Sequence, residues 1–74
     1  MIIYEKIYKK YEEYMTEADE MIRKGYETKR KPEYEDIDIL RGKLLLISEI
    51  TSNEFMNKKA KEKADELAYA VIDI

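Results

Sequence analysis

The sequence predicts an all-α fold, a small antiparallel three-helix bundle. In one interpretation the single chain forms the bundle alone, and in the other homodimerisation completes it. Apolar residues recur at helical rather than strand spacing along most of the chain. Helix-breaking residues gather around 25–32 and around 51–53. The 74 residues suffice for one domain, 1–74, and with no Cys or His that domain has neither a disulfide nor a zinc site to reinforce its small core.

The first predicted helix covers 2–24. On a helical wheel its apolar residues fall in one arc of roughly 140°. Arg23 and Lys24 suit the negative end of the helix dipole, and Gly25 can adopt the left-handed cap, so we expect the helix to end at Lys24. The arc contains Ile3, Tyr4, Ile7, Tyr8, Tyr11, Tyr14, Met15, Ala18, Met21 and Ile22.

A polar connection over 25–32 leads to the second predicted helix, 33–50. Pro32 suits the start of a helix, and an acidic stretch follows it near the positive end of the helix dipole. The apolar residues spread over about 180°, which suits a central helix with neighbours on two sides. They are Ile37, Ile39, Leu40, Leu44, Leu46, Ile47 and Ile50.

The third predicted helix covers 52–73. Thr51-Ser52-Asn53-Glu54 has the pattern of a capping box with Thr51 as the N-cap, so we expect a break here. The alternative is one long helix that continues from the second. The third helix has an apolar arc of roughly 120°, rich in alanine, which permits close approach to a neighbour. The arc contains Met56, Ala60, Ala64, Leu67, Ala68, Val71 and Ile74.

Composition bounds the class of protein. The net charge of −3 argues against a general nucleic-acid binder. The N-terminal residues lack a signal-peptide pattern and no apolar run is long enough to span a membrane, so we expect a cytoplasmic protein. The chain has no Gln and two Asn but many Lys, Glu and Ile, which indicates a thermophilic source; an AT-rich genome is the alternative.

Catalytic chemistry has little support in the sequence. Without His or Cys, the usual arrangements for nucleophilic catalysis are absent. Asp36-x-Asp38 starts like a calcium loop, but Leu40 and Ile47 occupy later ligand positions. We therefore expect a non-enzyme with no cofactor and no metal.

Tyrosines and basic residues are candidates for partner binding. Tyrosine combines a large apolar ring with a polar tip, as binding hot spots often do. Tyr4 and Tyr11 are expected in the core, whereas Tyr8 and Tyr14, at the margins of the arc, fit core and interface equally well. The basic segment Lys29, Arg30 and Lys31 can bind an acidic partner. Its alternative role is neutralisation by the acidic start of the second helix, and we favour that alternative.

Three further residues are partner-binding candidates. Lys43 falls within the apolar arc of the second helix, where an unpaired ammonium is costly. It either extends to solvent between two helices, which we favour, or meets a carboxylate at an interface. Tyr69 and Ile72 lie off the main arc of the third helix and form an apolar patch that this helix does not need for its own packing.

These observations predict a small helical protein–protein interaction module, which acts as a regulator, inhibitor or adaptor by binding a larger protein. We expect the chain to form a homodimer. In one scenario a phage or mobile element encodes it. The first alternative is a transcriptional regulator with a helix-turn-helix-like arrangement. Its lysines, Lys58, Lys59, Lys61 and Lys63, alternate with carboxylates that repel phosphate, which weakens it. The second alternative is a structural subunit of a larger assembly.

Overall fold

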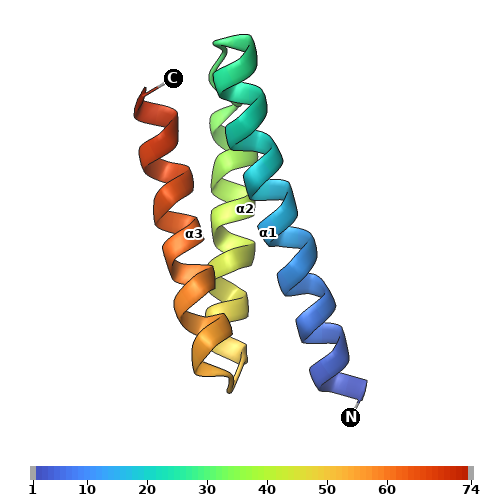
Figure 1. Ribbon diagram of the computed structural model, residues 1–74. Coiled ribbons are helices and arrows are strands. Elements are labelled where there is room, and N and C mark those ends of the chain that lie inside the picture. Colours follow the sequence, from blue (N-terminus) through green and yellow to red (C-terminus); the bar gives the residue numbers. More distant parts are fainter. Residues whose placement is uncertain (1, 74) are drawn as a thin grey trace.

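The computed structural model describes residues 2–73, with the backbone alone for 2–4, 71 and 73. It contains the helices α1 (Ile2–Thr28), α2 (Tyr34–Ile50) and α3 (Glu54–Asp73), and the described residues form no strand. Consecutive helices run antiparallel along a body of 42 × 19 × 16 Å (Figure 1). The predicted all-α three-helix bundle is confirmed, while the predicted core positions Ile3, Tyr4, Val71 and Ile74 lie outside the described side chains.

Helix α1 continues past its predicted end at Lys24 and stops at Thr28. Gly25 is buried inside the helix, and Lys29 instead takes the left-handed conformation, with φ 55°. The Thr28 hydroxyl donates to the Lys24 carbonyl at 2.7 Å and supports the last turn. The prediction that Gly25 caps the helix was therefore wrong, because the helix continues for one more turn and the left-handed residue that follows its end is Lys29.

A short break at 51–53 separates α2 from α3, so the two helices are not continuous. The side chain that caps α3 is Asn53, whose Oδ1 accepts the Met56 N–H at 3.0 Å. Thr51, the predicted cap, instead accepts the N–H of Asn53 at 3.2 Å. The Asn57 amide donates to the Ser48 carbonyl and ties the first turn of α3 to the last turn of α2.

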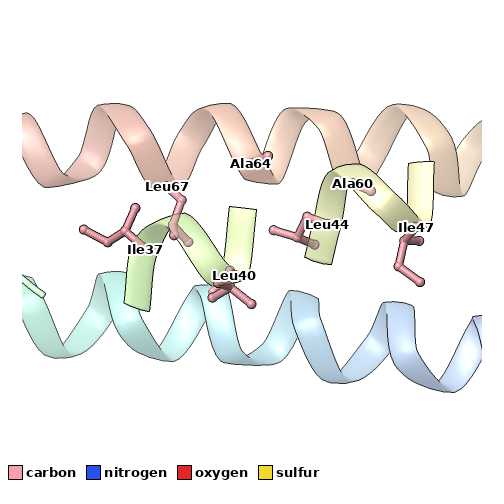
Figure 2. Packing of buried hydrophobic residues seen from close by; sticks show 8 residues of the cluster. Ile37, Leu40, Leu44, Ile47, Ala60, Ala64 and Leu67 are labelled. Atoms are coloured by element: carbon pink, nitrogen blue, oxygen red, sulfur yellow. The ribbon is translucent and has the colours of Figure 1, made fainter. Parts of the chain in front are cut away.

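The core lies where the three helices meet, and α2 supplies its largest share. Leu40 and Ile47 lie on the side of α2 that faces α1, and Leu67 of α3 reaches toward α2 (Figure 2). Small residues on α3 bring its backbone close enough for the Arg41 Nε to donate to the Ala64 carbonyl at 3.0 Å. The buried apolar side chains are Ala18, Ile37, Leu40, Leu44, Ile47, Met56, Ala60, Ala64, Leu67 and Ala70.

The three helices do not pack equally. Helices α2 and α3 share a more extensive interface with each other than either shares with α1. The N-terminal part of α1 diverges from the α2–α3 turn, and the chain termini lie at opposite ends of the bundle (Figure 1). On the face of α2 turned away from the core, Ile39, Leu46 and Ile50 are exposed.

Candidate protein-binding face on α2

The candidate site is an exposed apolar row on α2 made of Ile39, Gly42, Leu46 and Ile50, here called the outer face. The side chains of Ile39, Leu46 and Ile50 are 57%, 55% and 52% exposed. Their spacing of seven and four residues places them on one side of the helix, within roughly 40° of one another. The wide apolar arc was predicted to contact neighbours on two sides, and α2 does contact both α1 and α3, but this edge of the arc is left exposed.

Gly42 lies within the outer face and has no role in packing the chain. A Cβ built on Gly42 meets no atom within 4 Å. Glycine in a helix interior costs about 1 kcal/mol relative to alanine because it loses more backbone freedom on folding. The bundle therefore carries a destabilising residue at a position where any small side chain would fit.

One edge of the outer face is lined by the exposed carboxylates Glu35, Asp38 and Glu49, here called the rim carboxylates. No ion pair within 4.0 Å involves them in the part of the chain that the structure describes. Some carboxylates on the other helices do have such partners: Glu13 and Glu27 pair within α1, and Glu62 and Glu66 pair within α3. The outer face is thus an apolar row with an unneutralised acidic edge.

The opposite edge of the outer face is formed by Lys43, which the sequence identified as a candidate. Its side chain is half-buried, and its Nζ lies 5.2 Å from the centroid of the Tyr14 ring on α1. A cation over an aromatic face is stabilised by the ring's quadrupole. Lys43 and Tyr14 are therefore brought together across the α1–α2 interface, at the border of the outer face.

Tyr8 lies apart from the outer face, on α1. Its ring is partly exposed, and its centroid is 6.3 Å from that of Tyr11, which packs against the core. Burial, with the nearby Tyr8 as a second cause, raises the pKa of the Tyr11 hydroxyl. Tyr8 is thus the edge of an internal aromatic pair.

The basic segment Lys29, Arg30 and Lys31 is exposed at the end of the bundle where α1 turns into α2. No ion pair joins it to the acidic start of α2 among the residues described. Arg30 borders a hollow of about 550 Å³ between α1 and the connection. The lining of this hollow mixes both charges, which does not suit a phosphate: Glu17, Glu20, Met21, Lys24, Gly25, Thr28, Arg30, Pro32 and Asp36.

Tyr69 and Ile72 are exposed on α3, as the sequence predicted for residues off its apolar arc. Ile72 borders a small hollow of about 190 Å³ that also includes Tyr34 and Arg41 of α2. Tyr69 does not line this hollow. The predicted partner-binding residues therefore occupy separate parts of the surface and do not form one site.

Among the side chains that the structure describes, no group of three or more acidic residues is placed to hold a metal ion. Within residues 2–73, no helix combines the length and the apolar character needed to cross a bilayer. Two of the four lysines in the helix-turn-helix alternative are ion-paired: Lys59 with Glu62, and Lys63 with Asp19 and Glu66.

Comparison with known proteins adds no family to this geometry. No protein-family model matches the chain, and neither the curated proteins nor the solved structures contain a match. Lys43 was predicted from the sequence as a candidate, but the exposed row beside it was not. The signal that could have found the row is the width of the α2 apolar arc, which exceeds what the core of a three-helix bundle needs.

Proposed function

We propose that this chain is a non-enzymatic helical module that binds a larger protein through the outer face of α2 and acts as a regulator, inhibitor or adaptor. The observation that carries the proposal is the combination of three exposed apolar side chains with Gly42, which packs against nothing in the chain. Scattered exposed apolar residues are ordinary on protein surfaces, whereas an aligned row over three helical turns indicates an interaction surface.

The total surface area supports the same proposal. The chain exposes 5577 Å², whereas a compact monomer of its mass is expected to expose about 4,800 Å². The difference is close to the roughly 800 Å² that one partner buries in a standard protein–protein interface. The elongated shape of the body, 42 × 19 × 16 Å, contributes to this surplus together with the uncovered helix faces.

A second copy of the chain is a less suitable partner for this face. A two-fold axis parallel to α2 places the rim carboxylates of one copy beside the Lys43 edge of the other, whereas an axis perpendicular to α2 brings the same edge of both helices together. The rim carboxylates of the two copies would then face one another, and like charges at an interface oppose association. The charge pattern therefore favours a different protein over an antiparallel pair of two copies.

Site-specific photo-crosslinking in the cells that naturally express the protein tests this proposal. A photo-reactive amino acid in place of Leu46 should give one discrete adduct with another protein, and the additional change Ile39→Glu should abolish it. The same amino acid in place of Glu62, on the exposed side of α3, should not give that adduct. Equal adducts from both positions, or none from position 46, would contradict the proposal.

A further inference from the structure

We propose that the outer face of α2 receives an amphipathic helix whose apolar seam is flanked by lysine or arginine. This inference rests on the proposed function and specifies the chemistry of the partner. It draws on the length of the apolar row, the place of Gly42 within it and the charge along its edge.

The row has the dimensions of a helix-binding surface. From Ile39 to Ile50 the helix rises about 17 Å, which is three turns. A partner helix that presents apolar residues at positions i, i+3 or i+4, and i+7 would match this length. The row is straight and lies on a helix, whose backbone groups are already paired, so it offers no edge to an added β-strand.

Gly42 sets how closely that partner can approach. Helix axes in proteins lie about 8–10 Å apart, and the distance depends on the side chains at the point of contact. With no Cβ at Gly42, the partner can pack at the short end of this range while Ile39 and Leu46 enclose it from both sides. This accounts for a glycine at a place where the chain's own packing does not require one.

The rim carboxylates set the charge of the partner. Glu35, Asp38 and Glu49 have no ion-pair partner within the described chain, and they line the same edge of the row. Basic residues beside the apolar seam of a docked helix would lie next to them. The same carboxylates would repel a phosphate backbone, an anionic membrane or an acidic helix.

Two designed peptides test the inference with the full chain. Both are amphipathic helices of about four turns with one leucine seam; one carries lysines beside the seam and the other carries glutamates. Fluorescence anisotropy should show the basic peptide binding about tenfold or more tightly than the acidic one, since several exposed ion pairs are replaced by repulsive pairs. Added salt should weaken the basic peptide's binding.

Variants of the chain locate the binding. Gly42→Leu should weaken the binding of the basic peptide by about tenfold or more, because a bulky side chain blocks the close approach of the peptide helix to α2. Glu49→Lys should weaken it by about threefold or more. The control Lys58→Leu adds an exposed leucine to α3 and should leave binding unchanged. Circular dichroism should show the same helical content in all variants, because the space around Gly42 is open.

The outcomes separate this inference from the proposed function. Equal binding of both peptides, or binding that Gly42→Leu and Glu49→Lys leave intact, overturns the inference. If neither peptide binds while position 46 still crosslinks to another protein, the inference fails and the proposed function stands. If position 46 crosslinks only to a second copy of the chain, the basic helix is the wrong occupant. If neither peptides nor crosslinks are seen, both proposals fail.

Discussion

The ammonium of Lys63 on α3 lies 2.6 Å from the Asp19 carboxylate on α1 and joins the two helices. The Lys63 side chain is only 15% exposed, and it also donates to Glu66 at 2.9 Å. Burial acts to lower the pKa of Lys63, but the hydrogen bonds to Asp19 and Glu66 outweigh it, so the pKa lies above its ordinary value. α1, which packs less extensively than the other helices, is held partly by this charged group.

Removing this ion pair should reveal a measurable coupling between α1 and α3. A double-mutant cycle with Lys63→Met and Asp19→Asn should give a coupling free energy of about 0.5–1 kcal/mol in urea unfolding. The control cycle, Lys59→Met with Glu62→Gln, removes a longer and more exposed pair within α3, and its coupling should be close to zero. Equal couplings in the two cycles would show that Lys63 does not hold α1 in place.

Alkaline pH should weaken the fold through two groups. The pKa values of Lys63 and Tyr11 are both raised in the folded chain above their ordinary 10.5 and 10.0. A raised folded-state pKa contributes stability below the unfolded-state pKa, and that contribution is lost as the pH rises through the folded-state value. The melting temperature should therefore fall as the pH rises above about 10.

The variant Lys63→Met with Tyr11→Phe carries neither group. Its melting temperature should fall less steeply over the same alkaline range, even if it starts lower. Thermal unfolding followed by circular dichroism at a series of pH values measures both slopes. If the melting temperature falls equally steeply with pH in the variant and the parent chain, groups other than Lys63 and Tyr11 cause the loss of stability at alkaline pH.

The fold was predictable because local signals and the global arrangement agree. Three apolar arcs, Pro32 and the polar stretch before α3 are visible in the sequence, and each marks an element that the structure contains. The ends of the helices were harder to predict. Gly25 has the chemistry of a helix cap, but whether a glycine ends a helix or is buried within it depends on the neighbouring helices, which sequence periodicity does not describe.

The candidate site was predictable only in part. Lys43 was identified because a charge interrupted an apolar arc, yet its position over Tyr14 depends on how α1 and α2 are rotated against each other. Ile39 and Leu46 looked like core because the arc that contains them is apolar. That they are exposed depends on which side of α2 the helices α1 and α3 cover, and the periodicity of α2 does not specify this side.

Truncating a leucine to alanine should reduce the stability of the fold much more on the core side of α2 than on its exposed side. Leu44 is fully buried among the three helices, whereas the adjacent Leu45 is partly exposed. Leu44→Ala should cost about 3 kcal/mol through lost transfer free energy and a residual cavity, and Leu45→Ala less than about 1 kcal/mol. Urea unfolding monitored by circular dichroism gives both values. Similar losses for the two variants would place the core elsewhere.

The start of α3 should depend on Asn53 more than on Thr51. Asn53 accepts the Met56 N–H, one of the donors that a helix leaves unpaired in its first turn. Asn53→Ala should therefore destabilise the fold by about 1 kcal/mol, and Asn53→Asp should retain most of the stability. Thr51→Ala removes an acceptor outside the helix and should cost less. A larger loss for Thr51→Ala would restore the cap predicted from the sequence.

Gly42→Ala should make the isolated chain more stable than the parent. The new Cβ meets no atom within 4 Å, and alanine is favoured over glycine in a helix interior by about 1 kcal/mol. For a domain of this size, that gain should raise the melting temperature by about 4–8 °C. If Gly42→Ala leaves the melting temperature unchanged or lowers it, Gly42 serves the bundle itself, and the argument that it is kept for a partner fails.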